Sequence, residues 1–426
     1  MNEIGVLKSI PEKIVSFFDR PQVKKVMIPV GKGVPMGIER ISSPKVGIGG
    51  AYGTWGESYD NDSLPTFVAN SLGEPLSEKD KLNLSPLGFV YRHHVSGLTD
   101  EENLTVEIAV GSQFLREAAH ANGWEPEEID AILIGASGLT SEDYIIRIAK
   151  DAGIPENALK VSVHKACDSS VGALHLALNP NLPINKQLKR NLAEELAGKK
   201  VLVGGIEGLS HFVQRSHDKN ALQLFGNGVG IIGVVPGKTM EFVVGKSQEV
   251  FDEQGVLAVH MYYPHSKQRV AGQSLVEVNQ AGENYIQISG LMHEPEEDTS
   301  VVMAGPMGMV KLFVRSGVQV VQDVYQTYQE MMKKLDMPDK TIAATIVHHA
   351  NLKINQLKEK HLHGLGVQIS MPWVLSEFGN VSAASNMIAF LRQLPSLNPG
   401  DHILIDGFGA GTYYDALVVA LGGQTT

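Results

Sequence analysis

The sequence of 426 residues contains a single cysteine, Cys167. One thiol excludes an intramolecular disulfide framework and a metal cage built from several thiolates. A lone cysteine also fits a reducing compartment, and we expect the protein to be cytoplasmic. Residues 1–11 lack a basic region followed by an apolar run, so we expect no signal peptide.

Long runs of one residue class are missing as well. No uncharged apolar stretch reaches about 18 residues, which argues against a membrane-spanning helix. No long basic run occurs and the formal net charge is −11, which argues against a nucleic-acid-binding surface. Because 43% of the residues are hydrophobic and 19% are charged, the composition is typical of a globular chain with a large core.

Segments typical of buried strands alternate with segments typical of helices from residue 101 onward. In the first half we expect strands at 129–136, 200–207 and 224–235, and helices at 104–121, 141–153 and 168–178. In the second half we expect strands at 341–347, 401–407 and 413–421, and helices at 310–335, 350–363 and 382–394. This alternation predicts an α/β fold with layered sheets, in which the second half repeats the architecture of the first.

The repetition divides the chain into two halves with additions. We expect an N-terminal extension at 1–44, an N-terminal half at 45–236, an elaboration at 237–300 and a C-terminal half at 301–426. Within the extension, residues 23–30 favour a strand. Pro29 restricts that strand to the edge of a sheet, because proline has no backbone N–H to donate.

Cys167 lies at the junction between a predicted strand and a predicted helix. Val161 and Val163 alternate with polar residues, as at the end of a strand, and the residues from Asp168 to Leu178 are mostly small and apolar. A thiol at the start of a helix has its thiolate favoured by the helix dipole and by free backbone N–H groups. The alternative is an inert buried cysteine, because free cysteine is among the most buried residue types.

Two further polar residues stand at the ends of predicted strands or loops. His348 lies in Val-His-His-Ala-Asn-Leu-Lys, and Asn380 lies in Phe-Gly-Asn-Val-Ser-Ala-Ala-Ser. A thiolate can take an acyl group, while imidazole and amide N–H groups can hydrogen-bond a carbonyl oxygen that becomes negative. Each residue alone has an ordinary alternative, because histidine pairs at strand ends are often solvated and asparagine is a common helix N-cap.

Several motifs together resemble the β-ketoacyl-acyl-carrier-protein synthase III family of thiolase-fold condensing enzymes. They are Ala-Cys at 166–167, Phe-Gly-Asn-Gly-Val-Gly at 225–230, His-His-Ala-Asn at 348–351, Gly-Asn-Val-Ser-Ala-Ala-Ser at 379–385 and Gly-Phe-Gly-Ala-Gly at 407–411. They occur in the family's order over about residues 45–421. The resemblance implies a thiolase-like α/β fold, with two duplicated halves in a five-layered αβαβα core, and normally a homodimer.

The resemblance also implies roles for individual residues. Cys167 would carry the acyl thioester, and its backbone N–H and that of Ala410 would form an oxyanion hole. His348 and Asn380 would polarise the carbonyl of a malonyl thioester, which helps loss of CO₂ and stabilises the enolate. The enolate carbon would then attack the acyl group on Cys167. His349 stands where the family usually has glutamine.

Binding residues and partners follow from the same resemblance. We expect substrate contacts from Asn351 at the pantetheine arm and from Lys219, Phe408, Met303 and Glu142. Met303 would line an acyl tunnel or simply fill the core, and Glu142 lies beside the position of a family residue that caps the tunnel. The expected partners are an acyl-CoA or acyl-carrier-protein donor, a malonyl or β-ketoacyl extender on a carrier protein, and a second copy of the chain. This chemistry requires no metal or bound organic cofactor.

The chain departs from the family's pattern beside the cysteine and at the nucleotide site. Asp168 stands where close relatives have small uncharged residues, and its charge would oppose the Cys167 thiolate unless the side chain turns away. The aromatic and arginine residues that clamp the CoA adenine are not evident.

Alternative functions are acyl transfer to an oxygen or nitrogen nucleophile and a non-catalytic partner subunit. Release of CO₂ distinguishes condensation from acyl transfer, and the intact Cys, His and Asn argue against a non-catalytic subunit.

Overall fold

The computed structural model describes residues 26–137, 141, 143–249, 276–280, 282–289, 306–409 and 413–422. The predictions for Glu142, Met303 and Ala410 lie outside these residues. Within the described residues, the structure contains no helix with the length and apolar character that crossing a membrane requires.

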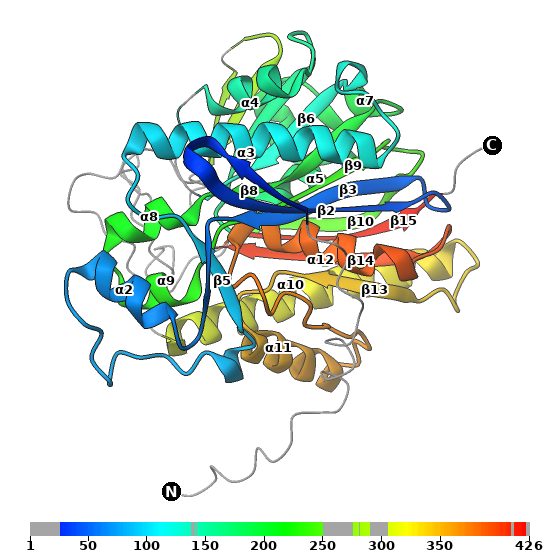
Figure 1. Cartoon of the computed structure of the whole chain (residues 1–426). Coiled ribbons are helices and arrows are strands. Elements are labelled where there is room, and N and C mark those ends of the chain that lie inside the picture. The colour runs from blue at the N-terminus through cyan, green and yellow to red at the C-terminus, as the bar shows by residue number, and fades with distance from the viewer. Residues whose placement is uncertain are drawn as a thin grey trace, which may run out of the picture.

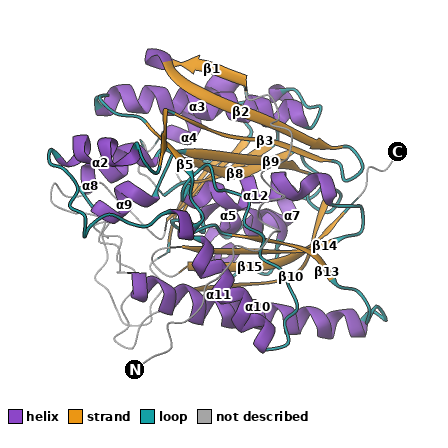
Figure 2. Ribbon diagram, turned by 60° about the horizontal axis from the view of Figure 1, so that its bottom comes forward, coloured by secondary structure: helices purple, strands orange, loops and turns teal. Residues whose placement is uncertain are grey.

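Two β-sheets and three helical layers stack on one another (Figures 1 and 2). Helices α5 (Ser169–Leu178) and α12 (Ser385–Gln393) lie between the sheets and pack against strands of both. Helices α3 (Asp100–Ala121) and α4 (Tyr144–Ala152) cover the outer face of one sheet, and α10 (Pro306–Lys334) packs on the outer face of the other, where α11 (Leu352–Gly364) lies against it. This is the five-layered αβαβα arrangement that the resemblance implies.

The larger sheet has nine strands in the order β1-β2-β3-β9-β8-β6-β7-β12-β11. Their bounds are Val26–Val30, Val34–Ser43, Ile48–Trp55, Gly228–Val234, Val201–Glu207, Ala131–Gly135, Leu159–His164, Tyr285–Ser289 and Glu277–Gln280. Strand β6 pairs in parallel with β7 and β8, and β7 pairs in parallel with β12. The parallel strands β6, β7 and β8 are buried almost throughout, as expected for strands covered by helices on both faces.

The smaller sheet has four strands in the order β10-β15-β14-β13. Their bounds are Met240–Glu249, Tyr413–Leu421, His402–Gly409 and Ile342–Val347. A hairpin of β4 (Glu57–Asp60) and β5 (Tyr91–His94) lies to one side of the layers, near α2 (Leu64–Leu72), α8 (Leu209–Ser216) and α9 (Lys219–Leu224). Two short helices, α6 (Ile184–Leu188) and α7 (Leu192–Leu196), complete the described helices longer than one turn.

The two segments that the sequence sets apart from the halves contribute strands to the sheets. Strands β1 and β2 extend the nine-stranded sheet at one edge, and β1 is the outermost strand, as Pro29 predicts. Strand β10 belongs to the smaller sheet, whereas β11 and β12 extend the opposite edge of the larger one. The division of the chain into four parts stays a prediction.

Helix α5 is buried over its whole length, and glycines in the neighbouring strands allow its close approach. All ten of its residues are buried. A Cβ atom on Gly135 of β6 would lie 2.6 Å from the Cβ of Ser169, and one on Gly407 of β14 would lie 2.2 Å from Oδ1 of Asp168. Both distances are far below van der Waals contact, so the start of α5 fits only against glycine at these two positions.

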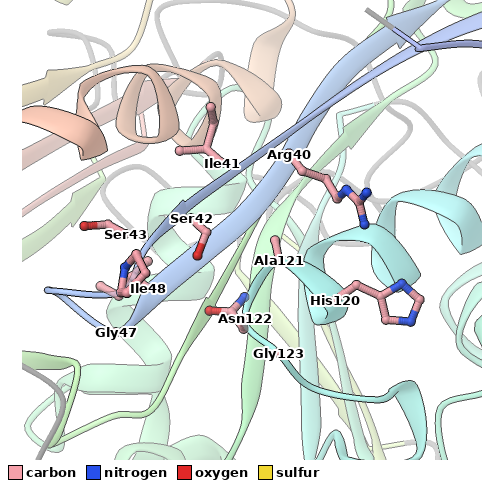
Figure 3. A pocket seen from close by; sticks show the side chains of 11 residues that line it. Arg40, Ile41, Ser42, Ser43, Gly47, Ile48, His120, Ala121, Asn122 and Gly123 are labelled. Atoms are coloured by element: carbon pink, nitrogen blue, oxygen red, sulfur yellow. The ribbon is translucent and has the colours of Figure 1, made fainter. Parts of the chain in front are cut away.

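A cavity of about 470 Å³ opens at one end of the larger sheet (Figure 3). It lies between the turn that joins β2 to β3 and the last residues of α3, and its lining includes Arg40, Ser42, His120 and Asn122. The side chain of Asn122 is engaged in the fold, because it bonds the backbone of Gly49 and of Ala118.

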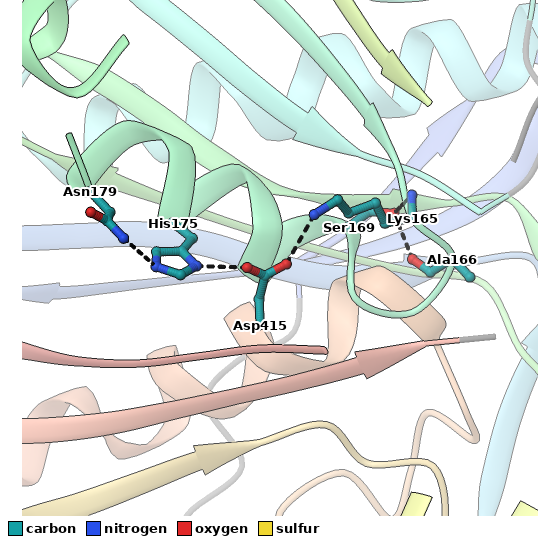
Figure 4. Close-up of polar contacts among 6 residues, drawn as sticks. All are labelled: Lys165, Ala166, Ser169, His175, Asn179 and Asp415. Atoms are coloured by element: carbon teal, nitrogen blue, oxygen red, sulfur yellow. Dashed lines mark hydrogen bonds and ion pairs between the residues drawn. The ribbon is translucent and has the colours of Figure 1, made fainter. Parts of the chain in front are cut away.

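A chain of buried polar side chains connects α5 to the smaller sheet (Figure 4). Lys165 Nζ lies 3.1 Å from Oδ2 of Asp415, and His175 Nδ1 lies 2.6 Å from Oδ1 of the same carboxylate. Asn179 Nδ2 lies 2.9 Å from Nε2 of His175. Burial alone would lower the pKa of Lys165, but the negative charge of Asp415 and its hydrogen bond outweigh it and raise that pKa.

A second buried ion pair joins α11 to β14. Lys358 Nζ lies 2.5 Å from Oδ2 of Asp406, and the two side chains are 0% and 1% exposed. Burial lowers the pKa of Lys358 and raises the pKa of Asp406, although each partner favours the charge of the other. Each charge takes the place of the water that would otherwise solvate its partner, so neither charge is tolerated in this core without the other.

We expect Lys358→Met to lower the free energy of unfolding by about 3–5 kcal/mol, because it leaves the Asp406 carboxylate buried without a partner. Urea-induced unfolding measures this change. Lys353→Met, on the exposed side of the same helix, is the matched control and should change the free energy by less than about 0.5 kcal/mol. A loss below about 1 kcal/mol for Lys358→Met would contradict the assigned role of the pair.

Candidate active site

The turn between β7 and α5 holds Cys167 in front of the helix N-terminus. Ala166 has a φ of 50°, which is a left-handed conformation that alanine rarely adopts. The Ser169 hydroxyl donates to the Ala166 carbonyl at 2.6 Å and accepts from the Lys165 N–H at 2.7 Å, which closes the turn (Figure 4). Cys167 is partly exposed and lies at the positive end of α5.

One loop, residues 379–385, contacts the cysteine and contains the predicted asparagine. The Ser382 hydroxyl lies 3.1 Å from the Cys167 sulfur. The Ser382 N–H donates to Oδ1 of Asn380 at 3.0 Å, so the amide oxygen is engaged and the Asn380 amide has its N–H groups for donation. Ser382 has a φ of 43°, a second strained conformation beside the sulfur.

Backbone bonds fix the position of Asn380. Its N–H donates to the Leu224 carbonyl at 2.8 Å, and its own carbonyl accepts from the Gly226 N–H at 3.1 Å. The motif at 225–230 therefore has a structural use, because it anchors the loop that carries Asn380.

His348 follows β13, and its ring is held on two sides. Nδ1 lies 2.5 Å from the Ser385 hydroxyl, and the ring packs edge-on against Phe408 with centroids 4.9 Å apart. Burial, with help from the positive charges of His349 and Lys358, lowers the pKa of His348 to about 3. The imidazole is therefore neutral, and a Ser385 hydroxyl that donates to Nδ1 leaves the ring proton on Nε2.

The loop 379–385 thus brings the three predicted residues into one hydrogen-bonded site. Ser382 bonds Cys167 and Asn380, and Ser385 bonds His348. These residues come from a helix start, a strand end and a loop that lie far apart in the sequence. The site has one thiol able to act as nucleophile and two neutral N–H donors, which is a set suited to acyl chemistry.

Sequence reasoning missed a buried carboxylate next to this loop. Glu207 ends β8 and is fully buried. Its Oε1 accepts from the Ser137 hydroxyl at 2.8 Å, from the Ser137 N–H at 2.9 Å and from the Ala383 N–H at 2.9 Å. Burial raises the pKa of Glu207 to about 7, although these donors oppose the rise. The available signal was an acidic residue at the end of an otherwise apolar strand.

The Asp168 side chain faces β14, because its Oδ1 lies 2.2 Å from the place of a Cβ atom on Gly407. It is fully buried and makes no N-capping hydrogen bond to α5. Burial and the negative charge of Asp415 raise its pKa well above the usual range. A raised pKa makes the charged form of Asp168 less favourable, which weakens the repulsion of a Cys167 thiolate that the sequence leaves open.

The predicted binding residues have structural partners of their own. Oδ1 of Asn351 accepts from the Ile354 N–H at 3.0 Å, which caps α11. Lys219 forms an ion pair with Asp80 at 3.1 Å. Phe408 is buried against His348 and does not line the surface. Their roles in substrate binding stay predictions.

The cavity of Figure 3 is lined by none of the predicted site residues. Across the described ranges, no group of three or more His, Cys, Asp or Glu side chains has an arrangement that could hold a metal ion.

Comparison with known proteins identifies relatives that share most of the chain. The family model described as 3-oxoacyl-[acyl-carrier-protein (ACP)] synthase III C terminal matches residues 331–421. Beta-ketoacyl-[acyl-carrier-protein] synthase III of Clostridium perfringens is 26% identical over 357 residues, which cover 82% of this chain and 93% of that protein. The chloroplastic beta-ketoacyl-[acyl-carrier-protein] synthase III of Arabidopsis thaliana is 25% identical over 367 residues, which cover 84% of this chain and 80% of that protein.

Solved structures share the fold along nearly the whole chain. The 3-oxoacyl-[acyl-carrier-protein] synthase III of Aquifex aeolicus has a TM-score of 0.56 at 18% identity and covers 91% of this chain and 100% of that chain. The C-terminal type III polyketide synthase domain of a Dictyostelium hybrid synthase has a TM-score of 0.60 at 14% identity, with 90% and 99% covered. The predicted thiolase-like α/β fold is confirmed. The chain is thus similar over most of its length, at about 25% identity, to β-ketoacyl-acyl-carrier-protein synthases III, and it has the thiolase-like fold of these condensing enzymes.

Proposed function

We propose that the protein joins an acyl group on Cys167 to a malonyl-type thioester by decarboxylative Claisen condensation, in fatty-acid or polyketide-type biosynthesis. The observation that carries the proposal is the set of bonds made by loop 379–385. That loop contacts the thiol of Cys167, orients the amide of Asn380 and fixes the ring of His348.

The first step is acyl transfer to the sulfur. The Cys167 thiolate, favoured by the N-terminus of α5, attacks the carbonyl carbon of the donor thioester. The carbonyl oxygen becomes negative and accepts from the backbone N–H groups of Cys167 and Ala410. The donor's carbon–sulfur bond then breaks and its thiolate leaves, so Cys167 keeps the acyl group as a thioester.

The second step is loss of CO₂ from the extender. His348 Nε2–H and the Asn380 amide donate to the thioester carbonyl oxygen of the malonyl group, where negative charge develops. The bond to the carboxylate breaks, CO₂ leaves and an enolate forms. Because His348 is neutral, it stabilises this oxygen by hydrogen bonding and does not protonate the enolate carbon.

The final step forms the carbon–carbon bond. The enolate carbon attacks the acyl carbonyl on Cys167, the carbon–sulfur bond breaks and the Cys167 thiolate is released. The proposed donor is an acyl-CoA or an acyl-carrier protein, and the proposed extender is carried by an acyl carrier protein. The names of the related proteins, which include the acyl carrier protein, support this choice of carrier. A homodimer is part of the same proposal.

The experiment that tests the function is intact-protein mass spectrometry after incubation with a panel of acyl-CoAs and acyl-carrier proteins. We expect an acyl adduct that disappears when malonyl-carrier protein is added, with release of CO₂. Discharge by alcohols or amines without CO₂ would support acyl transfer to an oxygen or nitrogen nucleophile and contradict condensation.

Cys167→Ala should abolish the acyl adduct, because it removes the thiol of the only cysteine in the chain. Intact mass and peptide mapping of the wild-type protein locate the adduct. An adduct of the same mass on Cys167→Ala protein would show that another residue is the nucleophile.

Asn380→Ala should leave acylation within about twofold and reduce condensation by about 10²–10³, the usual cost of losing one donor to a developing oxyanion. Rates of adduct formation and of CO₂ release separate the two steps. Asn398→Ala, an exposed asparagine, is the matched control and should change neither rate. An equal loss of both steps in Asn380→Ala protein would count against the assigned role.

A further inference from the structure

A continuous series of hydrogen-bonded side chains leads from the cysteine to a buried carboxylate. The Cys167 sulfur lies 3.1 Å from the Ser382 hydroxyl, which lies 2.5 Å from the Ser137 hydroxyl. The Ser137 hydroxyl lies 2.8 Å from Oε1 of Glu207. Ser137, Glu207 and Ser382 are all buried, so the series runs through the interior from the thiol to the end of β8.

Close backbone packing fixes the spacing of this series. The Ala383 N–H donates to Glu207 at 2.9 Å, which ties loop 379–385 to β8. A Cβ atom on Gly205 would lie 2.5 Å from the Ala383 carbonyl, so only glycine lets the loop approach the strand this closely. The contact between the hydroxyls of Ser382 and Ser137 therefore follows from the fold and does not depend on one flexible side chain.

The hydrogen atoms of the series have two complete arrangements. With a thiol and a carboxylate, Cys167 donates to Ser382, Ser382 donates to Ser137, and Ser137 donates to Glu207. With a thiolate and a carboxyl group, every donor direction is reversed, and Ser382 donates to the sulfur. Each hydroxyl donates once and accepts once along the series in both arrangements. The two arrangements differ only because each proton moves from one atom to the other within its hydrogen bond.

Burial favours Glu207 over His348 as a proton acceptor. Burial raises the pKa of Glu207 to about 7, whereas burial lowers the pKa of His348 to about 3. The titratable groups facing Glu207 are Glu107 of α3 and Tyr144 of α4, and burial raises both of their pKa values. Burial and the negative charge of Asp415 raise the pKa of Asp168 as well, but Asp168 is not part of the series. Glu107 also titrates in this range, with a pKa of about 8, but it lies outside the hydrogen-bonded series. Glu207, with a pKa of about 7, is the carboxyl group at the end of that series that gains or loses a proton close to neutral pH.

We propose that Glu207 accepts the proton of the Cys167 thiol through the hydroxyls of Ser382 and Ser137. This inference deepens the proposed function and rests on it for the role of Cys167 as nucleophile. The S–H bond breaks, each hydroxyl passes on its proton as it receives one, and an O–H bond forms on Glu207. When condensation later releases the Cys167 thiolate, the same series returns the proton to sulfur. No net charge enters or leaves the buried site.

Glu207 acts on the Cys167 thiol through two hydroxyl groups, so it is a positioning residue. Its role is therefore tested by the pH profile of Cys167 reactivity. We would measure the second-order rate constant for alkylation of Cys167 by iodoacetamide from about pH 5 to about pH 10, by intact mass. In the wild-type protein the rate should rise in two steps, the lower one following the ionisation of Glu207. Glu207→Gln should lose the lower step and react about tenfold more slowly at neutral pH.

Further variants separate the relay from a structural effect. Ser137→Ala should also lose the lower step, whereas Ser137→Thr keeps the hydroxyl and should restore it. Glu107→Gln is the matched control, since this buried carboxyl group is outside the series, and it should retain both steps. If Glu207→Gln fails to fold, the comparison of Ser137→Ala with Ser137→Thr decides. Retention of the lower step in Glu207→Gln or in Ser137→Ala protein would overturn the proposal.

Failure of this inference is distinguishable from failure of the proposed function. Alkylation reports ionisation of Cys167 without an acyl donor or an extender. Suppose that the wild-type protein discharges its adduct with release of CO₂, but that its alkylation profile has only one step. That result would support the condensing reaction and reject the relay.

Discussion

The burial of α5 between two sheets is the constraint on which the site depends. A helix covered on all sides has to start close to both sheets, and glycines 135 and 407 make that approach sterically possible. The same placement directs the N-terminus of α5 toward Cys167. It also puts the thiol beside loop 379–385, which belongs to the other half of the chain. The position of Cys167 is therefore a product of the layered packing of the fold.

Much of the site was predictable because its residues lie in short local motifs. Cys167, His348 and Asn380 each stand at a recognisable element boundary, and the strand-helix alternation predicts the layers that surround them. The edge position of β1 was predictable for a local reason too, since Pro29 cannot donate to a neighbouring strand. Where the evidence for a feature lies within a few residues, sequence reasoning is sufficient.

The features that escaped prediction depend on contacts between distant parts of the chain. Ser137 and Ser382 are 245 residues apart, yet their hydroxyls lie 2.5 Å from each other. The sequence leaves open whether Asp168 opposes a Cys167 thiolate, and only its burial beside Asp415 shows that its pKa is raised. The same is true of Lys358 and Asp406, whose pairing no periodicity indicates. Charge state in a core follows from three-dimensional neighbours, so it could not be read from residue type.

The left-handed conformations of Ala166 and Ser382 have a consequence for engineering. Each residue stores backbone strain of about 1–3 kcal/mol. Ala166 directly precedes Cys167, and the Ser382 hydroxyl lies 3.1 Å from the Cys167 sulfur. Glycine at either position would relieve this strain, so a search for thermostable variants would select these substitutions. Such changes would also loosen the cysteine turn and the loop that holds Asn380. Greater thermal tolerance gained there would come at the expense of a preorganised site, so improvements are better sought in the outer helical layers.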